Sequence, residues 1–197
     1  MSNESFDDAP SDGRRSFLTG TTCALFTAGG AGLMTPYVKS WSPSARAMAA
    51  GAPISIDLTK ISEGEMVVEE WRGRPIYVLK RSREMLESFE SLDEQLRNPS
   101  SEDDQQPVYA KNDNRSIKPE FLVVEGLCTH LGCTPKFRPN KNEEGFTGFF
   151  CPCHGSKFDF AGRVYKGVPA PTNLKVPPHH YVDDNTLIVG AEKEETA

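Results

Sequence analysis

The sequence predicts a mainly β fold: an antiparallel β domain with one helical insertion, preceded by a single N-terminal transmembrane helix. Three observations support this prediction. After residue 53, short segments rich in branched and aromatic side chains alternate with turn-forming residues, which is typical of strands. One segment among them repeats its apolar residues every three or four positions, which favours a helix. Near the N-terminus, residues 16–38 carry no charge and are long enough to cross a bilayer.

The uncharged stretch at residues 16–38 is the predicted membrane anchor. As a helix it would be roughly 34 Å long, against a hydrocarbon core of about 30 Å. Arg14 and Arg15 precede it in the sequence RRSFL, which looks like a twin-arginine export signal. Such a signal would leave residues 1–15 in the cytoplasm and place the rest of the chain outside. Cys23 stands alone within the stretch and is interpreted as a small apolar residue of the membrane segment.

Residues 39–53 form a predicted linker between the anchor and the β domain. Their sequence, KSWSPSARAMAAGAP, is rich in alanine, serine, proline and glycine. The alternating alanines could form or lose a helical turn at little cost. The small residues at 47–49 would also suit a cleavage site after an export signal, and this alternative stays open.

The predicted β domain spans residues 54–191 and is followed by a short tail at 192–197. Segments with strand character are 54–58, 66–71, 74–80, 120–124, 146–150 and 186–190. The helical insertion is predicted over residues 82–96, where Met85, Phe89, Leu92 and Leu96 follow a helical spacing. The acidic stretch from Asn98 to about Pro119 is predicted to be a solvated surface loop.

Aromatic residues and two histidines of the strand segments are interpreted as ordinary core or strand residues. They are Trp71, Phe149, Phe150, His179 and His180. The net charge of −6 offers no basic surface for nucleic acid.

Two short motifs concentrate residues that bind metals. CTHLGC at 128–133 and CPCHGS at 151–156 together hold four cysteines and two histidines. Covalent haem attachment is excluded, because one residue separates Cys151 from Cys153 where a haem motif has two. A tetrahedral structural zinc ion would leave two of the six groups unused. Two bridged irons need four protein ligands, and in Rieske-type centres these are two thiolates and two imidazoles.

Both motifs resemble those of the Rieske iron-sulfur subunits of quinol:cytochrome c oxidoreductases, the cytochrome bc complexes. The resemblance implies a Rieske-type domain with a smaller cluster-binding subdomain at about residues 122–172. The implied ligands of one [2Fe-2S] cluster are Cys128, His130, Cys151 and His154. Cys133 and Cys153 would form a disulfide that clamps the two loops together. A stable disulfide requires an oxidising compartment such as a periplasm.

The resemblance also implies that residues 39–53 act as a flexible hinge, and it implies roles for residues around the cluster. His154 would hydrogen-bond the quinol and accept its proton, and Leu131 would help to cover the cluster at the docking face. Ser156 would donate a hydrogen bond to a bridging sulfide. At Phe158 the chain departs from many members of the family, which have a tyrosine that hydrogen-bonds a ligand thiolate. The segment GVPAP matches a proline-rich shielding loop, through Gly167, Pro169 and Pro171.

The implied function is that of the electron-transfer subunit of a quinol–cytochrome c reductase, a proton-translocating oxidoreductase. One quinol electron would pass through this chain to a c-type cytochrome, and the second would pass to cytochrome b. The expected complex is dimeric and lies in a bacterial inner membrane, with the cluster domain in the periplasm. Three alternatives stay open: the Rieske small subunit of an exported arsenite oxidase, a Rieske ferredoxin-like carrier, and a zinc module.

Overall fold

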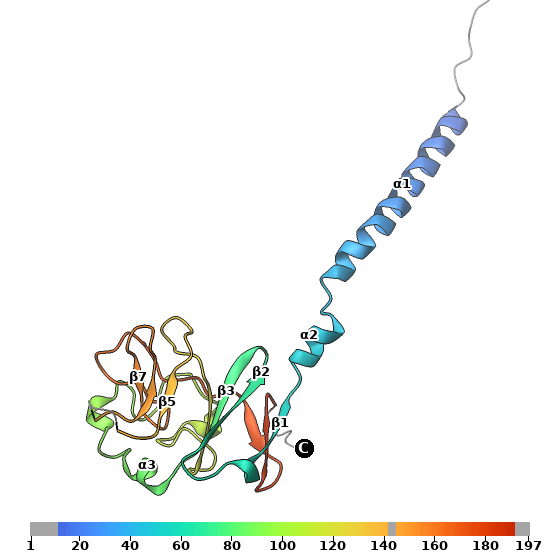
Figure 1. The fold of residues 1–197 in the computed structure, drawn as a ribbon. Coiled ribbons are helices and arrows are strands. Elements are labelled where there is room, and N and C mark those ends of the chain that lie inside the picture. The colour runs from blue at the N-terminus through green and yellow to red at the C-terminus, as the bar shows by residue number, and fades with distance from the viewer. Residues whose placement is uncertain (1–11, 142–144, 192–197) are drawn as a thin grey trace, which may run out of the picture. The chain divides into compact units, whose positions relative to one another are not determined.

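The computed structural model describes residues 12–141 and 145–191 of the chain (Figure 1). The chain divides into two compact units, one ending at Met48 and the other beginning at Ala49. The predictions for residues 1–11 and for the tail at 192–197 lie outside the described residues.

The first unit consists mainly of one long helix, α1 (Asp12–Ser40), which contains the predicted anchor. By length and composition it is the one helix in the described part of the chain that could cross a membrane. The hydroxyls of Thr27 and Thr35 each donate a 2.8 Å hydrogen bond to the carbonyl four residues earlier. These polar groups are therefore satisfied within the helix, as a lipid environment requires. A short helix, α2 (Ala45–Ala50), occupies the alanine-rich part of the predicted linker.

The second unit is built from three antiparallel sheets of three strands each (Figure 1). The first sheet has the order β1 (Ile54–Asp57), β9 (Thr186–Val189), β8 (His179–Tyr181). The second has the order β2 (Met66–Trp71), β3 (Arg74–Lys80), β4 (Phe121–Glu125). The third has the order β5 (Lys136–Arg138), β6 (Gly148–Phe150), β7 (Lys157–Phe158). Single turns of 3-10 helix are η1 (Leu58–Lys60), η2 (Asp93–Gln95) and η3 (Val108–Ala110).

The β2–β3–β4 sheet lies between two hydrophobic cores. Side chains alternate across a strand, so Ile76 and Val78 of β3 face the core shared with the β1–β9–β8 sheet. Tyr77 and Leu79 face the opposite core, which contains Cys128 and the residues of the third sheet. Burial on both faces explains why residues 75–79 and 121–124 contain no charged side chain. The sheet therefore forms the floor beneath the cysteine motifs.

The predicted strand segments correspond to β1, β2, β3, β4, β6 and β9, which confirms the mainly β fold. Strands β5, β7 and β8 are only two or three residues long, too short for a periodic signal. Trp71 and Phe149 are 5% and 0% exposed and lie in the cores as expected, whereas Phe150 is half-buried. His179 and His180 lie in β8, as expected of ordinary strand residues.

The helical insertion is much shorter than predicted, because α3 (Arg83–Glu87) covers only the first part of the predicted segment 82–96. The prediction is wrong beyond Glu87 for a local reason. The hydroxyls of Ser88 and Ser91 donate to the carbonyls three residues earlier, which offers the backbone an alternative to helical bonding. Arg163 also donates to the carbonyl of Phe89, at 3.3 Å. The apolar spacing here serves a folded loop.

The acidic stretch from Asn98 to Pro119 is solvated only in part, so the prediction of a surface loop needs correction. Its acidic side chains at 102–104 are exposed, but Ser101 and Arg115 are fully buried. The Arg115 guanidinium donates hydrogen bonds to the carbonyls of Ala161, Gly162 and Leu174. The stretch is thus fastened to the chain that follows the second cysteine motif.

Candidate metal centre

The two cysteine motifs form two loops with the same hydrogen-bond pattern. In the first loop, the Cys128 N–H donates to the Cys133 carbonyl at 2.7 Å, and the Gly132 N–H donates to the Cys128 carbonyl at 2.8 Å. In the second, the Cys151 N–H donates to the Ser156 carbonyl at 2.8 Å, and the Gly155 N–H donates to the Cys151 carbonyl at 2.9 Å. Cys128 and Cys151 therefore occupy equivalent positions.

Both loops turn at a glycine in the left-handed region of backbone conformation. The φ angles of Gly132 and Gly155 are 79° and 76°, a region in which a side chain is strained. The backbone conformation of each loop therefore requires the glycine of its motif.

The expected disulfide between Cys133 and Cys153 is present and joins the two loops. The sulfur atoms of this pair and of Cys151 lie within 4.8 Å of one another. Because Cys133 and Cys153 are bonded to each other, only Cys151 of these three can offer a thiolate to a metal.

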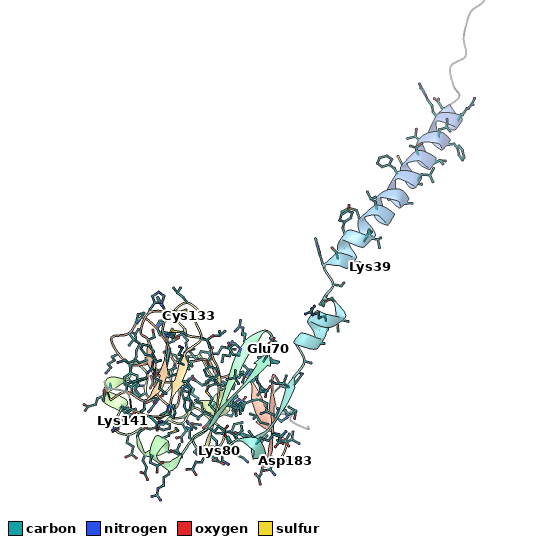
Figure 2. The ribbon with its side chains drawn as sticks, in the orientation of Figure 1. Lys39, Glu70, Lys80, Cys133, Lys141 and Asp183 are labelled. Atoms are coloured by element: carbon teal, nitrogen blue, oxygen red, sulfur yellow. A yellow bond between two sulfur atoms is a disulfide. The ribbon has the colours of Figure 1, made fainter. Side chains whose placement is uncertain are left out.

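Cys133 lies at one end of the domain and Asp183 at the other in the view of Figure 2.

The two remaining loop cysteines are free and buried, with Cys128 3% and Cys151 1% exposed. Burial raises the pKa of the Cys128 thiol, and hydrogen bonding to the Cys151 thiol raises this pKa further, so the two thiols lie side by side. Hydrogen bonds from the His130 backbone N–H and the Ser156 hydroxyl act in the opposite direction. Two adjacent thiols in an apolar core are poised to bind a metal, because a metal stabilises the thiolate that burial disfavours.

The two histidines lie next to each other, with ring centroids 4.7 Å apart and ring planes at 87°. His130 is half-buried, and its Nδ1 atom is buried without a hydrogen-bond partner among the described residues. His154 is exposed, as is Leu131, whose side chain is 71% accessible. An orphaned imidazole nitrogen on the same loops as two buried thiols fits a ligand set of two thiolates and two imidazoles.

The segment Gly167–Thr172, here called the cover segment, contacts both cysteine loops. Its Ala170 N–H donates a 3.0 Å hydrogen bond to the buried Ser156 hydroxyl of the second loop. Its Thr172 carbonyl accepts a 2.7 Å hydrogen bond from Thr129 of the first. Val168 packs against the core that includes the two free cysteines. The three residues singled out from the sequence, Gly167, Pro169 and Pro171, lie in this segment.

Phe158 is fully buried in the same core as Cys128 and Cys151. It lies in β7, paired with Phe149 of β6. A side chain on the neighbouring Gly148 would collide with the Phe158 carbonyl, so the glycine permits the close approach of these strands.

Several supporting residues are not evident from the sequence. Tyr77 of β3 donates a 2.7 Å hydrogen bond to the Pro135 carbonyl, which anchors the first loop to the central sheet. Thr129 lies within the first motif, where its position beside Cys128 was a usable signal. For Tyr77 the sequence carries no signal, because it reads as one more aromatic residue of a strand.

Replacing Cys133 and Cys153 together with serine is expected to preserve the fold but to lower stability by about 2–5 kcal/mol, the usual effect of removing a native disulfide. Thermal unfolding would measure the loss of stability, and the rate at which the visible absorption of the cluster bleaches would measure how readily the cluster is lost. Cys23→Ser is the matched control, because Cys23 lies in α1. Two free thiols at positions 133 and 153 of the native, oxidised protein would contradict the assignment.

Fold and site together define an electron-transfer class of metalloprotein, with two thiol and two imidazole donors on paired loops above an antiparallel sheet. Residues 56–178 match the family model described as the Rieske [2Fe-2S] domain. The chain belongs to the Rieske iron-sulfur family, among the ubiquinol-cytochrome c reductase iron-sulfur subunits.

Its relatives include the ubiquinol-cytochrome c reductase iron-sulfur subunit of Allochromatium vinosum, 48% identical over 91% of this chain and 89% of that protein. The subunit of the same name from Bradyrhizobium diazoefficiens is 40% identical over 96% of this chain and 100% of that protein. Among solved structures, a chain of a hyperthermophilic respiratory Complex III covers 86% of this chain and 98% of its own, with 26% identity and a TM-score of 0.49.

Proposed function

We propose that this chain is the subunit of a quinol–cytochrome c oxidoreductase that takes one electron from quinol and delivers it to a c-type cytochrome. The observation that carries the proposal is the site itself. The same two loops carry two buried thiols and two adjacent imidazoles, and one of the imidazoles, that of His154, is exposed. The relatives of this chain carry the name of such a reductase, which supports the same function.

Four side chains would hold the cofactor: Cys128, His130, Cys151 and His154. A [2Fe-2S] group with two imidazole ligands supplies one-electron chemistry at about −150 to +300 mV, a range accessible to quinols. Burial keeps water away from the two thiolates, whereas the imidazole of His154 reaches solvent.

The exposed imidazole of His154 would meet the quinol. An imidazole that binds iron through one nitrogen keeps a second nitrogen that can hold or release a proton. In this proposal the second nitrogen of His154 accepts a hydrogen bond and then a proton from the quinol hydroxyl. Leu131, exposed in the first loop, would provide apolar contact at the same surface. The Ser156 hydroxyl, which already contacts the Cys128 sulfur, would donate to the sulfur atoms of the site.

The expected partners are cytochrome b and a c-type cytochrome in a dimeric membrane complex. In this proposal α1 anchors the chain, and the pair Arg14 and Arg15 directs export with the site outside the cytoplasm. Residues 39–53, which include the short helix α2, would allow the domain to move between its partners. The disulfide supports an oxidising compartment such as the periplasm.

The deciding experiment is purification from membranes of a strain that carries a tagged copy of this chain. We expect cytochrome b and a c-type cytochrome to co-purify, together with quinol–cytochrome c reductase activity. The activity should be absent in a strain that lacks this chain and should return with the wild-type copy. Co-purification with a molybdenum-containing oxidase in place of the two cytochromes would contradict the proposal.

Phe158→Tyr is expected to raise the midpoint potential by tens of millivolts. Phe158 is buried in one core with the two proposed thiolate ligands, so an added hydroxyl can hydrogen-bond a thiolate. Such a donor stabilises the reduced, more negative state over the oxidised state. A difference of about 1 kcal/mol between the two states corresponds to roughly 40 mV. Redox titration of both proteins at one pH measures the shift.

The control for this substitution is Phe137→Tyr, because Phe137 packs at the edge of the same core but is only half-buried. Its added hydroxyl can reach solvent, so the midpoint should stay at the wild-type value. An unchanged or lower midpoint in a Phe158→Tyr protein with a full cluster content would refute the prediction.

A further inference from the structure

The cover segment is closed at its base by one buried side chain, that of Asn173, which is 1% exposed. Its Oδ1 atom accepts a 2.9 Å hydrogen bond from the Val164 N–H, on the chain that enters the segment. Asn173 itself directly follows the last residue of the cover segment. A second bond between the two chains runs from the Leu174 N–H to the Gly162 carbonyl at 2.8 Å. The Asn173 amide therefore joins the two ends of the loop that carries the cover segment.

The same amide also fastens this loop to the insertion between β3 and β4. The Asn173 Nδ2 atom donates a 3.1 Å hydrogen bond to the Asn98 carbonyl. A buried amide with both its acceptor and its donor engaged is costly to remove, because each partner is left unsatisfied in the interior. One side chain thus joins three stretches of chain beside the cysteine loops.

The insertion runs alongside residues 164–166, which lead into the cover segment. The Arg97 N–H donates to the Val164 carbonyl at 2.9 Å, and the Lys166 N–H donates to the Gln95 carbonyl at 2.8 Å. The exposed guanidinium of Arg97 lies 3.4 Å from the carbonyls of Val168 and Pro171, within the cover segment itself. The backbone of the insertion thus contacts the base of the cover segment, and the Arg97 side chain contacts the segment itself.

We propose that Asn173 is a positioning residue that holds the cover segment against the two cysteine loops by tying the base of the segment to the insertion. The insertion thereby acts as a support for the metal centre, a role distinct from partner docking. This inference rests on the proposed function only in that the cysteine loops hold the cluster. Without the Asn173 amide, the base of the cover segment is no longer held. The hydrogen bonds from Ala170 to Ser156 and from Thr129 to Thr172 then open more often, and water reaches the buried thiols.

The test is hydrogen–deuterium exchange of the purified full-length, cluster-containing protein, read on peptides from the cover segment. Asn173→Leu keeps the volume of the side chain and removes both hydrogen bonds, whereas Asn173→Ala removes volume as well. Both variants are expected to speed exchange at the cover segment by roughly tenfold, the equivalent of one net hydrogen bond. Exchange in β3 and β4 should stay unchanged, because the effect is local. The visible absorption should also bleach several-fold faster.

Two further variants keep the test decisive. Arg97→Ala changes an exposed residue, so this variant should fold even if the Asn173 variants do not. It tests whether the insertion supports the cover segment, and we expect hydrogen exchange of the cover segment to rise about twofold. Asn185→Ala is the matched control in an exposed turn, and its exchange should equal that of the wild type. Unchanged exchange of the cover segment in folded Asn173→Leu would overturn the proposal, as would equal acceleration in β3 and β4. If the wild-type protein held no cluster, that result would instead count against the proposed function. The two failures are distinguishable, because hydrogen exchange of the cover segment is measured separately from cluster content.

Discussion

Replacing any one of the four proposed ligands is expected to abolish the visible absorption and the reduced-state electron paramagnetic resonance signal of the protein. The changes are Cys128→Ser, His130→Ala, Cys151→Ser and His154→Ala. Each would leave one iron with three ligands, and the neighbouring groups offer no substitute. The sulfurs of Cys133 and Cys153 lie within 4.8 Å of that of Cys151, but they are held in the disulfide. Iron content and the resonance spectrum after dithionite reduction measure the outcome.

The chain offers matched controls for both residue types. Cys23→Ser alters the one free cysteine outside the two loops, on the exposed surface of α1. His180→Ala alters a half-buried histidine of β8 that bonds only the Ala191 carbonyl through its Nδ1 atom among the contacts of the described residues. Both controls should keep the full spectrum. A normal spectrum in any one of the four ligand variants would remove that residue from the ligand set.

The strands and the metal-binding loops could be predicted from the sequence because their signals are local. Residues 75–79 contain no charged side chain because both faces of β3 are buried. The two motifs place their cysteines, histidines and glycines within six residues, so each loop is complete in its own sequence. The disulfide was implied by family resemblance, since spacing alone does not fix which cysteines pair.

The insertion could not be predicted in the same way, because its conformation depends on residues far along the chain. Phe89 carries the apolar spacing of a helix, yet its carbonyl accepts a hydrogen bond from Arg163, more than seventy positions later. Arg115 stands in an acidic, polar stretch and is nevertheless fully buried among the carbonyls of residues 161–174. Nothing in the local sequence distinguishes such an arginine from a solvated one.

Replacing Asp159 with asparagine is expected to lower the free energy of unfolding by about 3–5 kcal/mol, the usual effect of removing one partner from a buried ion pair. Asp159 and Arg163 are each 1% exposed, and their Oδ2 and Nε atoms lie 2.7 Å apart. The other carboxylate oxygen accepts hydrogen bonds from the Ala161 and Arg163 backbone N–H groups. The carboxylate thus shapes the turn between the second cysteine motif and the cover segment.

The expected loss of stability is large because the charge of Asp159 interacts with more than one buried arginine. Burial lowers the pKa of both Arg81 and Arg115 to about 10, and the charge of Asp159 opposes this shift in each case. Both arginines stay protonated at neutral pH, since their pKa values remain well above 7. Asparagine would therefore leave three buried guanidinium groups facing a neutral side chain. The Asp93 carboxylate, 3.0 Å from Arg163, is more than half exposed and can compensate only weakly.

Thermal unfolding at one scan rate, followed by far-ultraviolet circular dichroism, measures the change, and we expect the midpoint to fall by roughly 10 °C or more. Asp104→Asn is the control, because it removes the same charge from an exposed site in the acidic stretch. Its midpoint should stay within about 2 °C of the wild type, since isolated surface charges contribute little. A similarly small change in Asp159→Asn would mean that the backbone bonds, which an asparagine oxygen can still accept, hold this turn without help from the charge.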